Sequence, residues 1–302
     1  MIAVFGSINI DLVTAVERIA APGETVMGEA YRVIPGGKGA NQALAARRAG
    51  ARVALIGAVG RDGFAETALA LLKQDGVDLS GVAAVEGPTG AAFISVDAAG
   101  ANAITVAAGA NAKTRAAQLD DAARSGGLLL LQREVPDREG EAAARIARQR
   151  GLRTLLNLAP SGRIPDTFLG LVDVLVVNEH EAADLAGFLA LPDDHAGLAA
   201  HLTTQFGIGA TVVTLGAEGA IGWAAGVEHR VPCPVVEARD TTAAGDSFLG
   251  FFAAALDAGL PFADAMRRGT AAGSLACTVA GAQPSIPFAA AVDALLAAES
   301  RA

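Results

Sequence analysis

The segment Asp240–Asp246 (Asp-Thr-Thr-Ala-Ala-Gly-Asp) has residues that could act on a phosphate group. Its small side chains leave backbone amides uncovered before the apolar segment Ser247–Leu256, which we expect to be helical. Unpaired amides at a helix N-terminus, together with the helix dipole, attract a transferring phosphoryl group. The carboxylate of Asp246 would repel that phosphate, so we expect it to accept a proton from an attacking hydroxyl. The alternative is an aspartate that merely caps the helix.

A second glycine-rich segment, Pro35–Gln42, could bring the backbone close to a ligand. Its paired glycines, Gly36 and Gly37, permit positive φ angles, and Asn41 lies one turn into the helix that we expect to follow. The alternative is a plain turn between a strand and a helix. The chain has no GxxxxGK[ST] motif and no GxGxxG motif after a strand, so the ordinary nucleotide-binding motifs are absent.

Polar residues follow the first short apolar run of the chain. Asn9 and Asp11 alternate with isoleucines, so that both point to one face and could hold adjacent hydroxyls. Ligands of open α/β sheets bind beyond the carboxyl ends of the strands, where these two residues are expected. The alternative is a polar strand end without a ligand.

Later apolar runs also end in polar residues. Asn178 and Glu181, three residues apart at an expected helix start, share a face and could hold a hydrated Mg²⁺. Glu134 and the segment Thr214–Gly219 follow two further runs. Each could be an exposed cap, but their joint placement at successive strand ends favours a shared site.

The order of the elements predicts an α/β fold with a doubly wound, mainly parallel sheet and helices on both faces, because short apolar runs alternate with segments of helical periodicity. The expected strands are Ile2–Phe5, Arg52–Ile56, Leu128–Gln132, Thr154–Asn157, Val172–Val177 and Thr211–Leu215. The expected helices are Gly39–Arg48, Phe64–Gln74, Lys113–Arg124, Glu139–Gln149, Glu179–Ala186, Leu198–Phe206, Ala243–Ala258, Phe262–Val279 and Phe288–Glu299.

Two stretches, Asp11–Pro35 and Thr89–Ala107, interrupt this alternation. They are rich in Val, Ile and Thr and have no helical period, so we expect them to form one small accessory sheet. The predicted organisation is a main α/β domain of residues 1–10, 36–88 and 108–302, with the small sheet formed by residues 11–35 and 89–107.

Composition excludes several classes of protein. The 302 residues are 52% hydrophobic and 18% charged, which excludes extended disorder. The net charge of −9 argues against a nucleic-acid partner, which needs a basic face. Two distant cysteines, Cys233 and Cys277, exclude a disulfide framework and fit a reducing compartment. We interpret the N-terminal apolar run as a first strand rather than a signal peptide, and Gly269–Val292 as a buried helix and a loop rather than a membrane span. We therefore expect a cytoplasmic protein.

Taken together, these motifs resemble those of the ribokinase, or PfkB-type carbohydrate kinase, family. The resemblance covers nearly the whole chain, with several motifs in the same order. They are Gly-Ser-Ile-Asn-x-Asp at Gly6, Pro-Gly-Glu-Thr-Val at Pro22, Gly-Gly-Lys-Gly-Ala-Asn-Gln at Gly36, Asn-x-x-Glu at Asn178, Thr-Leu-Gly-x-x-Gly at Thr214, Asp-Thr-x-Ala-Ala-Gly-Asp at Asp240 and Gly-Ala-Gln-Pro-Ser at Gly281.

The resemblance implies a role for each matching residue. Asp246 matches the catalytic base, and Ala243, Ala244 and Gly245 match the amides of an anion hole. The residues that match the sugar-binding set are Asn9, Asp11, Gly37, Lys38, Asn41, Glu134 and Asp246. The residues that match ATP contacts are Asn178, Thr214, Leu215, Gly216, Ala217, Glu218, Gly219, Gly245 and Thr270.

The resemblance also implies cofactors and partners. Glu181 matches an acidic residue associated with Mg²⁺ through water. A monovalent-cation site, usually for K⁺, is matched by Asp240, Thr242, Ala276, Val279, Gly281 and Ser285. The small sheet matches a lid that covers the sugar and pairs two subunits. Departures from the family pattern are Thr242, often aliphatic in relatives, and Val279-Ala280, often more basic, and the role of Arg133 stays open.

The expected activity is ATP-dependent phosphorylation of a sugar hydroxyl, with D-ribose at O5 as the first expectation. A kinase for another sugar or for a nucleoside is an alternative, although the chain has only one Trp, one Tyr and 11 Phe with which to stack on a base. A sugar or nucleotide sensor on the same fold is a further alternative, since fold does not determine function. A sensor has no need of a base at Asp246.

Overall fold

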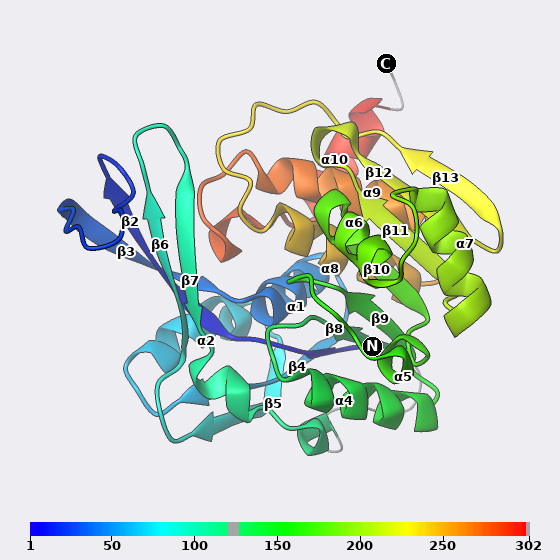
Figure 1. Cartoon of the computed structure of the whole chain (residues 1–302), viewed down its shortest axis with the longest axis horizontal. Coiled ribbons are helices and arrows are strands. Elements are labelled where there is room, and N and C mark those ends of the chain that lie inside the picture. Colours follow the sequence, from blue (N-terminus) through cyan, green and yellow to red (C-terminus); the bar gives the residue numbers. More distant parts are fainter. Residues whose placement is uncertain (120–126, 300–302) are drawn as a thin grey trace.

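The main sheet of the computed structural model has nine strands in the order β13-β12-β11-β10-β9-β8-β1-β4-β5 (Figure 1). The structure describes residues 1–119 and 127–299. The strands from β5 to β11 pair in parallel, and β12 and β13 form an antiparallel edge. This confirms the predicted α/β fold. The strands are β1 (Ile2–Phe5), β4 (Val53–Gly60), β5 (Asp78–Val85), β8 (Leu128–Leu131), β9 (Arg153–Asn157), β10 (Val174–Asn178), β11 (Ala210–Thr214), β12 (Ala220–Ala224) and β13 (Val227–Val231).

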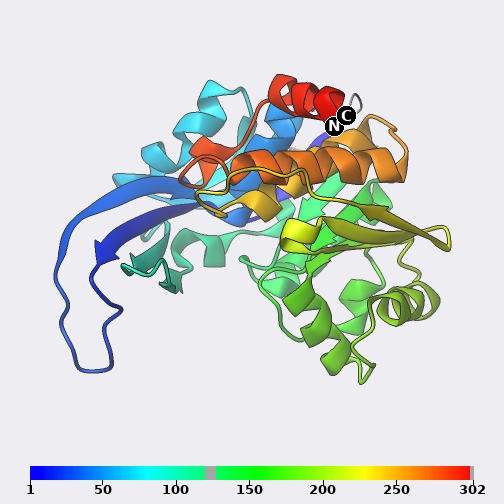
Figure 2. The ribbon, with the colours of Figure 1, turned by 90° about the horizontal axis from the view of Figure 1, so that it is seen from above.

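Helices cover both faces of this sheet (Figure 2). Successive strand residues point to opposite faces, so Ile2 and Val4 belong to one hydrophobic core, and Ala3 and Phe5 to the other. The helices on the first face are α1 (Lys38–Arg48), α2 (Phe64–Gln74), α8 (Ala244–Asp257), α9 (Phe262–Ala276) and α10 (Ala289–Glu299). Those on the second are α4 (Asp137–Gln149), α5 (Asp166–Leu169), α6 (Glu179–Phe188) and α7 (His195–Phe206).

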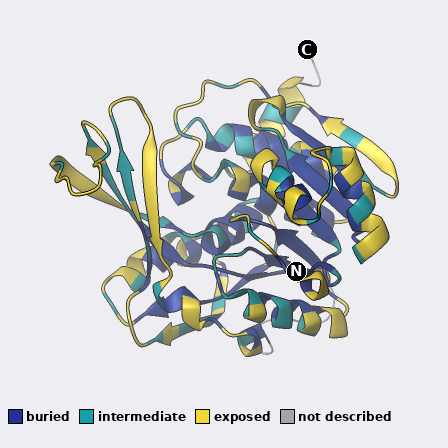
Figure 3. Cartoon of the chain, in the orientation of Figure 1, coloured by how far each residue is buried: buried dark blue, intermediate teal, exposed yellow. Residues whose placement is uncertain are grey.

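The two stretches that interrupt the α/β alternation form a separate four-stranded sheet, as expected. Its order is β3-β2-β6-β7, with β2 and β6 parallel and the other two pairs antiparallel. The small sheet projects from the main body, and β7 is exposed along its whole length (Figures 1 and 3). The strands are β2 (Asn9–Val16), β3 (Gly28–Gly36), β6 (Gly90–Val96) and β7 (Asn102–Ala107).

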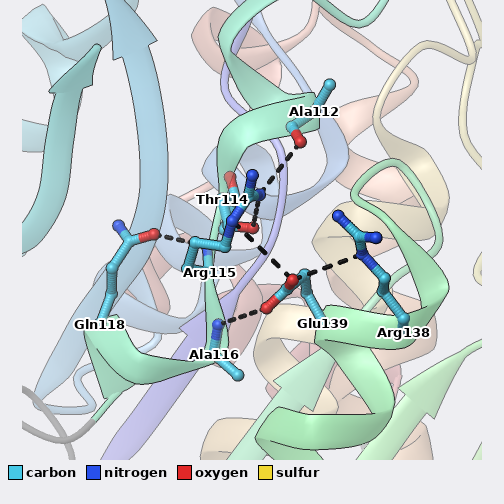
Figure 4. Close-up of polar contacts among 7 residues, drawn as sticks. All are labelled: Ala112, Thr114, Arg115, Ala116, Gln118, Arg138 and Glu139. Carbon is cyan, nitrogen blue, oxygen red and sulfur yellow. Dashed lines mark hydrogen bonds and ion pairs between the residues drawn. The ribbon is translucent and has the colours of Figure 1, made fainter.

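Within the helix expected over Lys113–Arg124, Leu119 is helical, but the prediction is wrong for residues 113–118. That part has 3₁₀ turns at Gly109–Lys113 and Ala116–Gln118, and residues 120–124 lie outside the described residues. Tertiary contacts compete with a helix here, because Ala116 N donates to Glu139 Oε2 at 3.0 Å (Figure 4). The side chain of Gln118 accepts from Arg115 N at 2.6 Å and donates to the carbonyls of Gly57 and Gly81.

Other differences have local causes. Helix α9 ends at Ala276 rather than Val279, and the carbonyl of Cys277 accepts hydrogen bonds from Arg239 N and Asp240 N instead of continuing a helix. Strands β5, β12 and β13 were not predicted from the sequence. They lie toward the two edges of the sheet, and β5 and β12 contain the glycines Gly81 and Gly222. None of the helices in residues 1–119 and 127–299 has the length and apolar character that crossing a membrane requires.

Candidate active site

Asp246 lies in the first turn of α8 and is 8% exposed. Its Oδ2 accepts a hydrogen bond from Asn41 Nδ2 at 2.9 Å, and its Oδ1 accepts one from Gln42 Nε2 at 2.8 Å. Helices α1 and α8 pack closely enough for these bonds because residue 250 is glycine, where a Cβ would overlap Ala45. The fold thus brings together the two glycine-rich segments, Pro35–Gln42 and Asp240–Asp246.

The backbone before Asp246 presents free amides. Ala243 adopts a left-handed conformation with φ 60°, which ends the preceding loop and begins α8. Ala244 N donates to Thr241 O at 3.2 Å, whereas the amides of Ala243, Gly245 and Asp246 have no acceptor in the described part of the chain. Three of the four amides at this helix start can therefore bind an anion.

A cavity of about 230 Å³ opens in front of these amides. Seven residues predicted for the site line it: Lys38, Asn178, Glu181, Thr214, Ala243, Gly245 and Asp246. A larger cavity of about 470 Å³ lies beside Asp137, Phe188 and the loop at Arg163, and no predicted site residue lines it. The chemistry of the lining, rather than the volume, therefore identifies the 230 Å³ cavity as the candidate site.

Lys38 places a positive charge in this cavity. Burial alone would lower the pKa of the Lys38 ammonium, but the carboxylates of Asp246, Glu134 and Glu181 raise it above its ordinary value. The side chain is therefore protonated at neutral pH. A fixed cation beside a proton acceptor can neutralise charge that develops on a phosphoryl group.

Asn9 and Asn41 are buried residues at the starts of β2 and α1. Asn9 Oδ1 accepts a hydrogen bond from Asn111 Nδ2 at 2.7 Å, and Asn111 also bonds the backbone of Ile8 through both of its amide atoms. Asn41 Oδ1 is buried and has no partner among the described residues. Its capacity to accept a hydrogen bond is therefore unused.

Asp11 belongs to a group of carboxylates at this end of the site. Burial, followed by the charges of Glu134 and Asp246, raises the pKa of Asp11 to about 7. Its carboxyl lies against Gly36, where any Cβ would overlap it, so the second glycine-rich segment has to be this small. Hydroxyl donors from a ligand would relieve the repulsion among these acids.

Glu134 and Arg133 diverge although they are neighbours in the sequence. Glu134 Oε2 accepts from Ser7 Oγ at 2.6 Å and from Lys38 N at 3.1 Å, which holds it at the site. Arg133 forms a two-bond ion pair with Asp137 and donates to the carbonyl of Gly162 at 2.8 Å. Arg133 thus connects the start of α4 to the loop that follows β9, so its role is structural.

Asn178 and Glu181 form a capping box at the start of α6. Asn178 Oδ1 accepts from Glu181 N, and Glu181 Oε2 accepts from Asn178 N, both at 2.8 Å. Burial is the main cause that raises the pKa of Glu181, with Asp184 and Asp246 adding to it. One oxygen of each side chain is thus engaged in the cap, and Glu181 Oε1 is the carboxylate oxygen that stays available to a hydrated cation.

The nucleotide candidates Thr214–Gly219 form the end of β11 and the turn that follows it. Gly216–Glu218 is an exposed 3₁₀ turn, closed by a hydrogen bond of 2.8 Å from Leu215 N to Gly219 O. Thr270 lies apart on α9, where it is buried and its hydroxyl donates to Met266 O at 3.0 Å. Its side chain is engaged within its own helix.

Asp240 joins two of the segments predicted for a monovalent cation. Its Oδ1 accepts from Thr242 N at 2.9 Å and its Oδ2 from Gly281 N at 2.8 Å. Burial opposes ionisation of Asp240, but these hydrogen bonds and the charge of Arg32 lower its pKa below the ordinary value. Ser285 Oγ donates to Ala282 O at 2.7 Å, so its oxygen keeps acceptor capacity.

Sequence reasoning assigned no role to several residues that shape this site. Gln42 ends the second glycine-rich segment, and Gln132 and Asn157 end two of the expected strands. Ser7 and Asn111 bond Glu134 and Asn9 through contacts between residues more than 100 positions apart. Only the position of Gln42 beside Asn41 offered a signal.

Comparison with known families matches residues 1–289 to the pfkB family of carbohydrate kinases. The chain belongs to this family. It is therefore a kinase that transfers phosphate to a carbohydrate hydroxyl, and the resemblance drawn from the sequence motifs is confirmed.

Individual relatives of this pfkB kinase are similar over nearly their whole length. A ribokinase of Haemophilus influenzae is 39% identical over 290 residues, which cover 95% of each chain. The crystal structure of a Thermotoga maritima ribokinase is 33% identical with a TM-score of 0.89, and covers 98% of this chain and 99% of its own. An Arabidopsis thaliana ribokinase, solved with ribose and ATP, is 30% identical with a TM-score of 0.87 and covers 98% of both chains.

Proposed function

We propose that this kinase transfers the terminal phosphate of ATP to O5 of D-ribose, which gives ribose 5-phosphate and ADP. The observation that carries the proposal is the position of Asp246. Its carboxylate accepts a hydrogen bond from Asn41 of the segment Pro35–Gln42. Asp246 also lines the same cavity as Lys38 and Gly245, whose backbone amide is free. The similarity to ribokinases, one of them solved with ribose and ATP, supports ribose as the acceptor.

In the proposed reaction, Asp246 accepts the proton of the O5 hydroxyl as O5 attacks the γ-phosphorus. The bond from this phosphorus to the bridging oxygen of ATP breaks, and that oxygen leaves with ADP. Lys38 and the amides of Ala243, Gly245 and Asp246 neutralise charge on the phosphoryl oxygens. Phosphoryl transfer needs mainly positioning and charge neutralisation, so an ordinary carboxylate suffices as the base.

The sugar would be held by the acids and amides around Asn41. Asn9, Asp11, Asn41 and Glu134, with the backbone at Gly37, would bond its other hydroxyls. On the nucleotide side, Asn178 and the Thr214–Gly219 turn would contact ATP, and we propose Gly245 and Thr270 as further nucleotide residues, Thr270 through packing since its hydroxyl is engaged.

Two cations fit the donor chemistry of this structure. Proteins usually hold Mg²⁺ with one or two carboxylates, together with water molecules and the phosphates of the substrate. Glu181 lines the cavity and has one carboxylate oxygen outside the helix cap, so it could serve as such a ligand through water. When bound, Mg²⁺ supplies neutralising charge to the ATP phosphates. K⁺ would be held by oxygens of the segments that Asp240 joins, at Asp240, Thr242, Ala276, Val279, Gly281 and Ser285.

The small sheet would serve as a lid and as a dimer contact. Exposed apolar side chains lie on its strands: Tyr31, Phe93, Ile104 and Val106 are each more than half exposed. Exposed apolar surface of this kind is typical of surfaces that meet a partner. We propose that a second copy pairs there, that residues 11–35 and 89–107 close over the sugar bound by the main domain, and that the enzyme works in the cytoplasm.

The test is ADP release by the wild-type enzyme across ribose, 2-deoxyribose, fructose and adenosine, each in K⁺ and in Na⁺. We expect ribose to give the highest kcat/KM, with faster turnover in K⁺. A clear preference for fructose or adenosine would contradict the substrate. Thermal stabilisation by ribose and ATP without release of ADP would indicate a sensor instead.

A further inference from the structure

Gln42 contacts the proposed base directly but belongs to no part of the site described for sugar, nucleotide or metal. It is completely buried in α1, and its Nε2 donates to Asp246 Oδ1 at 2.8 Å and to Asn157 Oδ1 at 3.1 Å. Its Oε1 accepts from Gln132 Nε2 at 2.6 Å. Both N–H donors of this amide and one lone pair of its oxygen are therefore engaged.

The partners of Gln42 fix the direction of its amide. A carboxylate only accepts hydrogen bonds, so Gln42 has to turn its nitrogen toward Asp246 and its oxygen toward Gln132. The other partners are anchored to the sheet, because Gln132 directly follows β8 and Asn157 ends β9, where its Nδ2 donates to Val176 O at 3.3 Å. The chain of amides thus connects a side chain of α8 to two central strands.

We propose that Gln42 is a positioning residue for the kinase reaction: it fixes the rotation of the Asp246 carboxylate, and Gln132 fixes Gln42. The inference rests on the proposed role of Asp246 as the base. One carboxylate oxygen is held by Gln42 and the other by Asn41, so the rotation of the carboxylate is fixed and each oxygen keeps a lone pair for the attacking hydroxyl. A proton acceptor must lie within hydrogen-bond reach of the attacking hydroxyl, and a small misplacement is costly.

The variant Gln42→Met keeps the length of the side chain and removes its donor and acceptor. We expect kcat to fall about 10–100-fold, as for a misplaced catalytic group. The KM for ribose should stay within about 3-fold of the wild-type value. Among the residues proposed to bind the sugar, Gln42 forms a hydrogen bond only with Asp246. Gln132→Met should lower kcat by a smaller factor in the same way.

Gln118→Met is the matched control. Gln118 likewise uses both N–H donors, to the carbonyls of Gly57 and Gly81, and its oxygen accepts from Arg115 N (Figure 4 shows the bond to Arg115). None of these partners belongs to the proposed active site. This variant should lose thermal stability and keep kcat within about 3-fold of the wild type, since a structural loss outside the site does not alter the reacting groups.

A double-mutant cycle separates positioning from general damage. In an Asp246→Asn background, Gln42→Met should change the residual kcat by less than about 3-fold, because residues that act as one unit are not additive. An equal loss in both backgrounds, or an unchanged kcat in the single variant, would overturn the proposal. If the Gln42→Met variant does not fold, the same double-mutant cycle with Gln132→Met tests whether the chain of amides positions Asp246.

Failure of the proposed substrate is a separate outcome. It appears in the wild type, as weak ADP release with ribose, whereas failure of the positioning role appears only in the variants. The cycle is then measured with whichever sugar of the substrate panel the wild type phosphorylates fastest.

Discussion

Asp246→Asn is expected to lower kcat by about 10²–10⁴-fold, the usual contribution of a general base. The side chain keeps its size but can no longer take up the hydroxyl proton. The KM for ribose should change far less than kcat, because the lost interaction belongs to the transition state. ADP release at saturating ribose and ATP measures the effect.

Stability has to be measured beside this activity. An asparagine at position 246 can accept from only one of its two donors, Asn41 and Gln42, and would turn its own amide nitrogen toward the other. The melting temperature of the variant therefore shows whether the fold persists. Asp264→Asn, an exposed change near the start of α9, is the control and should keep full activity. Near-normal turnover of the Asp246→Asn variant would show that Asp246 is not the catalytic base.

Asp11→Asn is expected to stabilise the free enzyme while it weakens ribose binding. The pKa of Asp11 is about 7 in the folded protein, above its ordinary value of 3.8, because of burial and the carboxylates of Glu134 and Asp246. Between these pH values the folded state binds more protons than the unfolded state, so the free energy of unfolding falls as pH rises. An uncharged asparagine at position 11 does not ionise, so the variant avoids this fall in the free energy of unfolding.

The melting temperature of Asp11→Asn should therefore exceed that of the wild type at pH 8, and the difference should disappear near pH 4. The KM for ribose should rise about 10–100-fold, since hydrogen bonds to a charged group are each worth about 1.5–3 kcal/mol. Melting curves and steady-state kinetics at both pH values measure the two effects. A variant that is less stable than the wild type at pH 8 would show that Asp11 does not contribute repulsion.

Local patterns were enough to predict the α/β fold and its small accessory sheet. The alternation of apolar runs and helical periods predicted the parallel sheet, and the motifs at Gly36 and Asp240 predicted which segments meet near Asp246. Strands β5, β12 and β13 were not predicted, because edge strands need less hydrophobic sequence than central ones. The 3₁₀ turn at Ala116 depends on Glu139, a contact that no local pattern records.

Electrostatics and side-chain pairing were the least predictable features. The pKa of Asp11 depends on Glu134 and Asp246, which are distant in sequence. Gln42 acquires its role only because α8 packs on α1, and Asn178 and Glu181 bond one another as a cap as well as facing the cavity. Residue types mark such positions as polar, but only the tertiary structure gives each its partner.

The most direct measurement of phosphoryl transfer to O5 compares ribose with 5-deoxyribose, which lacks that hydroxyl. Wild-type enzyme with ATP should release ADP with ribose, and ³¹P NMR should show one new phosphate ester coupled to the protons of C5. With 5-deoxyribose, ADP release should fall to the rate without sugar. Equal ADP release with both sugars, or an ester on any other oxygen, would contradict transfer to O5.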